Sequence, residues 1–166
     1  MIPIVLFVAP SGTGKTTLLE AVIRSMEGRG FKVGTLKHTS HDLKFDREGT
    51  DSKRFCDAGA RLAVVSSPRE LALIQKTEQE QTLEQIVEQY FGGVDILLIE
   101  GFKTWRCAKI EVFRGEAGTD LICRGERNDP DLIAVVSDAD LDVDVPVLPL
   151  EDPVSVADFI IQRFLS

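Results

Sequence analysis

The stretch "VAPSGTGKTTLLEAV", residues 8 to 22, decides the fold of this 166-residue chain. Residues 9 to 16 follow the phosphate-loop pattern of Gly, four residues, Gly-Lys and then Ser or Thr, except that Ala9 replaces the first glycine. The apolar run before the loop predicts a buried strand, and the apolar spacing after it predicts a helix. A strand, a glycine-rich turn and a helix in this order predict a phosphate site.

The residue types of this loop suit a nucleoside triphosphate. Glycines let the backbone curl so that N–H groups, here those of Ser11 to Gly14, point at phosphate oxygens, and the helix N-terminus adds its positive dipole end. Lys15 would reach the β- and γ-phosphates, and the Thr16 hydroxyl would bind Mg²⁺. We therefore expect Ser11, Gly12, Thr13, Gly14, Lys15 and Thr16 to bind the nucleotide.

A second acidic element lies in "VDILLIEG", residues 94 to 101. Asp95 starts this expected strand and Glu100 ends it, which places them roughly 16 Å apart at about 3.3 Å per residue. Ligands of open parallel sheets bind at the carboxyl ends of the strands, which favours Glu100 and leaves Asp95 without chemistry. We expect Glu100 to hold Mg²⁺, directly or through water, or to position an attacking water, and to form the catalytic pair with Lys15.

Polar residues follow two other expected strands at the same edge. In "LKHTSHD", Asp42 is a second Mg²⁺ candidate and Lys37 could meet an anionic ligand, whereas the two histidines complete no recognisable metal site. In "VVSDAD", Asp138 or Asp140 could accept hydrogen bonds from the N1–H and amino group of guanine. The alternative for these two carboxylates is an ordinary place in a turn.

The alternation of strands and helices predicts an α/β, three-layer P-loop NTPase fold with a mostly parallel central sheet, in a single domain over 1–166. The segment 61–75 adds a β-hairpin, and 108–114 alternates like a more exposed strand. Buried or extended strands are expected at 2–8, 31–38, 94–101, within 131–140 and at 144–150. Helices are expected at 16–28, within 51–59, at 82–91 with Thr82 and Gln85 as a capping box, and from Pro153 with Asp152 as the cap.

Composition narrows the function classes. The chain has 27 acidic and 19 basic residues, a net charge of −8, which disfavours nucleic acid as a partner. The absence of an apolar run of ~20 residues and of a basic, signal-like start predicts a cytoplasmic protein that does not enter membranes. The three cysteines are widely spaced and form neither a zinc pattern nor a disulfide framework.

Four segments in order, "SGTGKTTL", "LKHTSHD", "GTDSKRFCDAGA" and "DILLIEGFK", resemble the MobB-type molybdopterin-guanine dinucleotide biosynthesis adaptor family. The resemblance implies a dimeric P-loop GTPase of low activity that binds GTP and Mg²⁺. It would assist the molybdenum cofactor guanylyltransferase, which joins GMP to molybdopterin. Carried over by this resemblance, Thr17 joins the nucleotide site, Glu100 and Asp42 lie near Mg²⁺, and the basic residues that could face the pterin phosphate or the partner are Lys37, His38, Arg54 and Lys103.

The sequence departs from the family pattern at two positions. Ala9 stands where the family usually has the first loop glycine, which bears on the loop geometry. Thr50 stands where a lysine commonly precedes the aspartate, which weakens the case for an anion site there. The hairpin at 61–75 would be marginal alone, so we expect a second protomer to pair along it in a homodimer.

Two other functions compete with this interpretation. A small-molecule or nucleoside kinase would use arginines that close over the phosphoryl group, and "RGERND" offers Arg124 and Arg127. A GTPase that delivers nickel would need a cysteine or histidine cluster near the nucleotide, and the cysteines do not cluster in sequence. A module that binds nucleotide without turnover is a third alternative.

Overall fold

The computed structural model describes residues 2–10, 12–39, 47–117, 120–125 and 128–166. Ser11, His41, Asp42 and Arg127 lie outside these ranges. The chain forms two compact units, each described separately below: the sheet unit, Met1–His38 with Phe91–Ser166, and the hairpin unit, Thr39–Tyr90.

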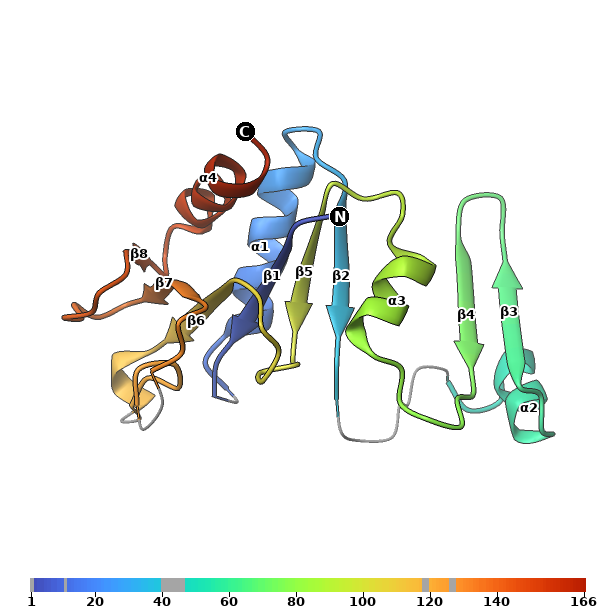
Figure 1. Ribbon diagram of the computed structural model, residues 1–166. Coiled ribbons are helices and arrows are strands. Elements are labelled where there is room, and N and C mark those ends of the chain that lie inside the picture. The colour runs from blue at the N-terminus through green and yellow to red at the C-terminus, as the bar shows by residue number, and fades with distance from the viewer. Residues whose placement is uncertain (1, 11, 40–46, 118–119, 126–127) are drawn as a thin grey trace. The chain divides into compact units, whose positions relative to one another are not determined.

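The sheet unit is built on a six-stranded sheet whose strands all pair in parallel (Figure 1). Across the sheet the strands run in the order β2-β5-β1-β6-β7-β8, so β1 lies between two strands from the middle of the chain. This arrangement confirms the predicted α/β fold with a parallel central sheet. The strands are β1 (Ile4–Val8), β2 (Val33–Lys37), β5 (Ile96–Glu100), β6 (Lys109–Phe113), β7 (Leu132–Ser137) and β8 (Val147–Pro149).

Two helices, α1 (Lys15–Glu27) and α4 (Pro153–Phe164), pack on one face of this sheet and against each other (Figure 1). Alternate side chains of each strand point to this face, which explains why every second strand residue joins one core. That core contains Val5 and Phe7 of β1, Ile96 and Leu98 of β5, Ile110 and Val112 of β6, Ala134 and Val136 of β7, Leu18, Leu19, Val22 and Met26 of α1, and Val156, Ala157 and Ile160 of α4.

Strand β6 departs from the sequence prediction. It lies between β1 and β7, and four of its five residues are buried, so the expectation of a more exposed strand is wrong. Lys109 forms an ion pair of 2.6 Å with Asp129, and the carboxylate of Glu111 accepts the backbone N–H groups of Ile122 and Cys123 at 2.5 and 2.9 Å. Both charges can be buried because the polar segment after β6 folds back and supplies their partners.

The hairpin unit contains α2 (Asp51–Asp57), the antiparallel hairpin of β3 (Leu62–Ser66) and β4 (Leu71–Gln75), and α3 (Leu83–Tyr90). The predicted capping box of α3 is present, with reciprocal hydrogen bonds between Thr82 and Gln85. Thr50, at the position where the sequence departs from the family pattern, caps α2 by accepting the N–H of Lys53. Among the described residues, strands β3 and β4 pair only with each other, so the hairpin predicted at 61–75 is confirmed as a separate two-stranded sheet.

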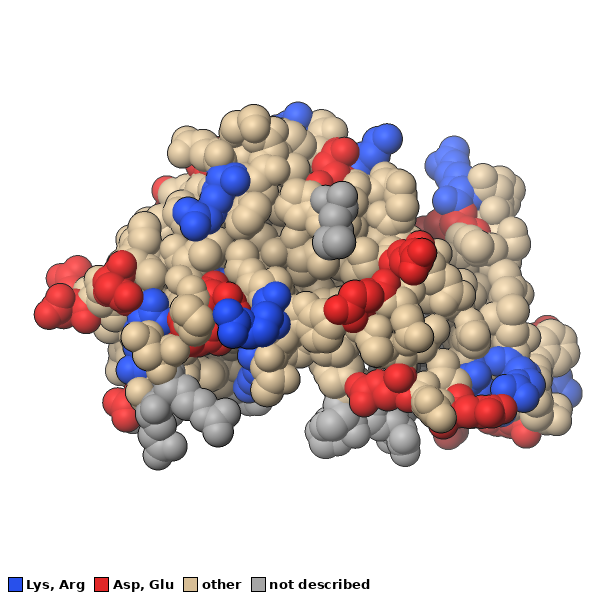
Figure 2. Space-filling view, in the orientation of Figure 1, with Lys and Arg blue, Asp and Glu red and all other residues tan. Residues whose placement is uncertain are grey.

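Acidic and basic side chains are interspersed on the face of the protein seen in Figure 2. Among the described residues, no helix is long and apolar enough to cross a bilayer.

Candidate functional site

The predicted phosphate loop joins β1 to α1. Gly12 and Gly14 have φ angles of 82° and 83°, a left-handed backbone that glycine adopts without strain. The side chain of Thr13 is buried, and its hydroxyl donates to the carbonyl of Pro10 at 3.0 Å. This hydrogen bond links the start of the turn to its middle. From Gly12 to Gly14, the backbone thus has the left-handed glycine conformations that allow successive N–H groups to face an anion.

The N-terminus of α1 differs from those of the other capped helices. Asp152 caps α4 and Thr50 caps α2 with side-chain oxygens, whereas Gly14 at the N-cap of α1 has no side chain. The first turn of α1 also contains no acidic residue. Backbone N–H groups at a helix start need an acceptor, and an anion can supply it. Lys15, Thr16 and Thr17 form this first turn, with the two threonines exposed.

Ala9 fits the loop without a glycine. It is 3% exposed and packs in the core with the sheet residues. Its φ is not positive, since among the described non-glycine residues only Phe102 has a positive φ. The first position of the loop thus needs a small buried side chain here rather than left-handed backbone.

Glu100 and Lys15 lie together at the carboxyl edge of the sheet. Glu100 ends β5, which runs between β1 and β2, so the phosphate loop flanks it on one side and Lys37 on the other. Its Oε1 is 3.0 Å from the Lys15 ammonium and 3.5 Å from that of Lys37. Burial acts to raise the pKa of Glu100, but the hydrogen bond and charge of Lys15, with those of Lys37, outweigh it and lower the pKa below 4.5.

Thr16 and Glu100 also offer an oxygen pair. The Thr16 hydroxyl lies 3.5 Å from Oε2 of Glu100, whereas Lys15 contacts the other oxygen, Oε1. Mg²⁺ is commonly held by one or two protein oxygens together with waters and phosphate oxygens, so these two residues fit such an ion. Within the part of the chain that the structure describes, no group of three or more His, Cys, Asp or Glu side chains is arranged for a metal.

The turn after Glu100 is tightly built. Gly101 has a φ of 110°, and a Cβ there would lie 2.7 Å from the carbonyl oxygen of His38. The His38 ring stacks on Phe102 with centroids 4.1 Å apart, and Phe102 meets the edge of Trp105. Sequence reasoning did not identify this aromatic group, although the glycine after the strand-end acid was a signal of close backbone approach.

Arg114 is a second residue that the sequence analysis missed. It directly follows β6, between the phosphate loop after β1 and Asp138 after β7. Its Nε donates to the carbonyl of Thr13 at 2.8 Å, and its Nη1 lies 3.5 Å from Oδ2 of Asp138. The other oxygen of Asp138 accepts the N–H of Gly115 at 2.9 Å. The strand order, which brings these residues together, is not visible in the sequence.

A pocket of about 530 Å³ opens at the carboxyl ends of β7 and β8. Asp138 and Asp140 both line it, together with Ser137 and the segment from Val147 to Glu151. The two carboxylates considered for guanine recognition therefore share one pocket.

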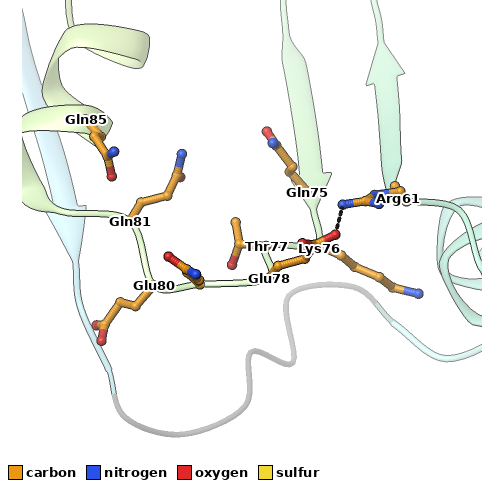
Figure 3. Close-up of a pocket in the computed structure, with 9 residues that line it drawn as sticks. Arg61, Gln75, Lys76, Thr77, Glu78, Glu80, Gln81 and Gln85 are labelled. Carbon is orange, nitrogen blue, oxygen red and sulfur yellow. Dashed lines mark hydrogen bonds and ion pairs between the residues drawn. The ribbon is translucent and has the colours of Figure 1, made fainter.

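The hairpin unit has a smaller pocket of about 370 Å³ lined by polar side chains (Figure 3). Its basic residues are engaged within the unit: Arg61 pairs with Glu78 at 2.7 Å, and Lys76 donates to the carbonyl of Cys56 at 2.6 Å. Gln75, Gln81 and Gln85 also line it (Figure 3). This pocket lacks the curled glycine backbone of the phosphate loop.

Arg124 and Cys123, residues considered for the kinase and nickel-delivery alternatives, are engaged in their own part of the fold. Arg124 makes a two-pronged ion pair with Asp144 at 2.6 and 3.2 Å and donates to the carbonyls of Cys123 and Asp129, so it holds its own loop. A mobile lid arginine would need to leave all of these acceptors. Cys123 is buried, which with the nearby Glu111 carboxylate raises the pKa of its thiol to about 12 and disfavours the thiolate that binds metals.

The match of this chain to a known protein family covers the phosphate loop and the other candidate site residues up to Asp138. The family model described as "Molybdopterin guanine dinucleotide synthesis protein B" (MobB) matches residues 4–138, from β1 and the phosphate loop to Asp138. The chain belongs to the MobB family.

Relatives and solved structures of this family resemble the whole chain. The molybdopterin-guanine dinucleotide biosynthesis adapter protein of Escherichia coli K12 is 39% identical over 98% of this chain and 93% of its own length. The protein of that name from Haemophilus influenzae is 31% identical over 96% of this chain and 88% of its own length. A crystal structure of molybdopterin-guanine biosynthesis protein B aligns with a TM-score of 0.78 at 25% identity, covering 96% of this chain and 99% of that one. Bacillus subtilis MobB aligns with a TM-score of 0.77 at 26% identity, covering 98% of both chains.

Proposed function

We propose that this protein is a GTP-binding adaptor with slow GTPase activity. It assists the attachment of GMP to molybdopterin in the synthesis of the guanine dinucleotide form of the molybdenum cofactor. The observation that carries the nucleotide part is the curled loop from Gly12 to Thr16, with Lys15 3.0 Å from Glu100. The names of the family members support the pathway.

In this proposal the loop N–H groups and Lys15 hold the phosphates of GTP. Thr16 and Glu100 hold Mg²⁺, with Asp42 as a further candidate outside the described residues. When bound, Mg²⁺ neutralises charge on the phosphates. Lys15 and Lys37 lower the pKa of Glu100, so the carboxylate is ionised beside them. When Lys15 turns to a phosphate, Mg²⁺ would replace its ammonium as the cation beside this carboxylate. Ser11 and Thr17 complete the proposed nucleotide site.

The pocket at Asp138 and Asp140 is the proposed place for guanine. A carboxylate has about four lone-pair sites, so Asp138 can keep its bond to Gly115 and still accept a donor from a base. Guanine presents two donors, N1–H and the amino group, whereas adenine lacks such a pair.

The hairpin unit is the proposed dimer surface, with a second copy of the chain as its occupant. One face of the hairpin carries Leu62 and Val64 of β3 beside Leu73 and Leu71 of β4, with exposed fractions of 54, 51, 37 and 67%. An isolated two-stranded sheet with an exposed apolar face is marginal in water. Two copies covering this face would remove that defect.

The remaining partners are molybdopterin and the molybdenum cofactor guanylyltransferase. Lys37 and Lys103 are exposed near the carboxyl end of the sheet. His38 follows Lys37 in sequence and stacks on Phe102, the neighbour of Lys103, so these three residues are candidates for an anionic pterin. Arg54 belongs to the hairpin unit, where it pairs with Asp51 at 3.3 Å.

The test is equilibrium competition between GTP and ATP, with and without Mg²⁺, in the wild type, Lys15→Ala and Lys32→Ala. Lys32 is a matched control because its exposed side chain lies at the opposite end of β2 from the site. We expect the wild type to prefer GTP, Lys15→Ala to lose binding and Lys32→Ala to keep it. A preference for ATP would contradict the guanine assignment, and unchanged binding by Lys15→Ala would contradict the phosphate site itself.

A further inference from the structure

Arg114 contacts the phosphate loop through a backbone carbonyl oxygen and not through one of the N–H groups expected to bind phosphate. Its Nε–H donates to the carbonyl oxygen of Thr13 at 2.8 Å. The Thr13–Gly14 peptide is planar and trans, so its carbonyl oxygen and the N–H of Gly14 point in opposite directions. Fixing the Thr13 oxygen therefore aims the Gly14 N–H away from Arg114. In a phosphate loop, such N–H groups donate to the bound phosphates.

The guanidinium also lies over Gly14. A Cβ at Gly14 would be 3.2 Å from Nη2 of Arg114, and the φ of 83° would strain any other residue at this position. The Thr13–Gly14 peptide is thus constrained by the hydrogen bond from Arg114 and by the left-handed backbone of Gly14.

Asp138 holds Arg114 from the opposite side. Its Oδ2 lies 3.5 Å from Nη1, and its Oδ1 accepts the N–H of Gly115, the next residue after Arg114. Since β6 lies between β1 and β7, these contacts run across three neighbouring strand ends. A change at Asp138 would therefore reach the phosphate loop through Arg114.

We infer that Arg114 is a positioning residue of the nucleotide site: held by Asp138, it orients the Thr13–Gly14 peptide so that the Gly14 N–H is ready for a phosphate. This inference rests on the proposed binding of nucleotide at the loop. It assigns Arg114 a role shared by every nucleotide with a β-phosphate, rather than a contact with the base or with the γ-phosphate.

The test compares the affinities for GTP, GDP and ATP of the wild type with those of Arg114→Gln, Arg114→Lys and Arg24→Gln. Arg24 is the matched control, an exposed arginine in the last turn of α1. We expect Arg114→Gln to weaken all three nucleotides by a similar factor of about ten, as for one lost hydrogen bond to a charged donor. Arg114→Lys, which keeps a donor for the Thr13 carbonyl, should recover part of the loss.

Each other outcome has a distinct meaning. Unchanged affinities in Arg114→Gln, or a loss confined to GTP and ATP that marks a direct γ-phosphate contact, would overturn the inference while the proposed function stands. If the wild type binds none of the three nucleotides, the proposed function fails and the inference fails with it. Asp138→Asn should weaken ATP as well as GTP, and a loss confined to guanine nucleotides would overturn the role of Asp138 in holding Arg114.

Discussion

Glu100 is the residue on which the groups of the proposed site converge. One carboxylate oxygen faces two lysines and the other faces the Thr16 hydroxyl. A carboxylate between two ammonium groups balances their charge before any phosphate arrives. Once phosphate oxygens take over that balance, the same carboxylate is available to Mg²⁺. Under the proposed function, Glu100 would therefore couple phosphate binding to metal binding.

This coupling predicts a specific phenotype for Glu100→Gln. The amide keeps the shape but loses the charge, so it no longer competes with phosphate for Lys15 and no longer attracts Mg²⁺. We expect GTP binding without Mg²⁺ to be retained or tightened, and the gain on adding Mg²⁺ to fall by about tenfold or more, the factor of a ~1.4 kcal/mol loss. Titration with GTP at several Mg²⁺ concentrations measures both effects. A wild-type dependence on Mg²⁺ in Glu100→Gln would exclude Glu100 from the metal site.

The lowered pKa of Glu100 also predicts a pH dependence of stability. Because the folded pKa lies below the usual 4.5, the ionised carboxylate stabilises the fold above that value. This contribution is lost as the pH falls through the lower, folded pKa. We expect the difference in unfolding free energy between wild type and Glu100→Gln to be largest above about pH 5 and to shrink in more acidic solution. Urea unfolding across this range measures it, and a difference that grew on acidification would have the wrong sign.

At the scale of elements, β6 shows how a central strand can contain charged residues. Lys109 and Glu111 are almost completely buried, and their partners come from 11 to 20 residues further along the chain. The alternation of charged and apolar residues in "KIEVF" is typical of a strand with one solvent-exposed face. What covers the second face is a polar segment whose backbone N–H groups and Asp129 satisfy the charges. This pairing could not be predicted from the local pattern.

Removing the Glu111 carboxylate should lower the stability of the fold strongly. Glu111→Ala leaves the N–H groups of Ile122 and Cys123 without their acceptor, and the Cys123 N–H is buried. We expect a loss of about 3 kcal/mol in unfolding free energy. Chemical denaturation measures the loss, and Asp142→Ala, at an exposed acid, should stay within about 0.5 kcal/mol of the wild type. Cys123 should also react faster with a thiol reagent. Equal stability of the two variants would show that Glu111 does not hold the segment.

At the scale of the whole molecule, local sequence patterns predict the individual helices, strands and loops better than they predict which of these lie side by side. The phosphate loop, the hairpin, two helix caps and the parallel sheet are all readable from local patterns and are present. Ala9 departs from the glycine of the loop pattern, and its burial against the core explains why a small apolar side chain fits there. Arg114 carried no local signal, because its importance comes from β6 standing beside β1, an order that only the folded sheet defines. Residues at or just after the ends of β1, β2, β5, β6 and β7 form the candidate site, and the chain separates them by up to about 125 residues, from Thr13 to Asp138.

The oligomeric state is the last prediction, and it belongs to the whole molecule. Val64 is 51% exposed on the apolar face of the hairpin, opposite Leu73, and a lysine there would place a charge within the proposed dimer contact. Val154→Lys is the matched control, because Val154 is 48% exposed but lies in the first turn of α4.

Sedimentation velocity over a range of concentrations measures the outcome. We expect a dimer for the wild type and for Val154→Lys, and a monomer for Val64→Lys. GTP affinity per chain should remain within about threefold in Val64→Lys, a change below ~0.7 kcal/mol, since the phosphate loop belongs to the sheet unit. A Val64→Lys protein that remained dimeric would move the dimer contact away from this face. A wild type that stayed monomeric at every concentration would instead leave the exposed face for the partner enzyme.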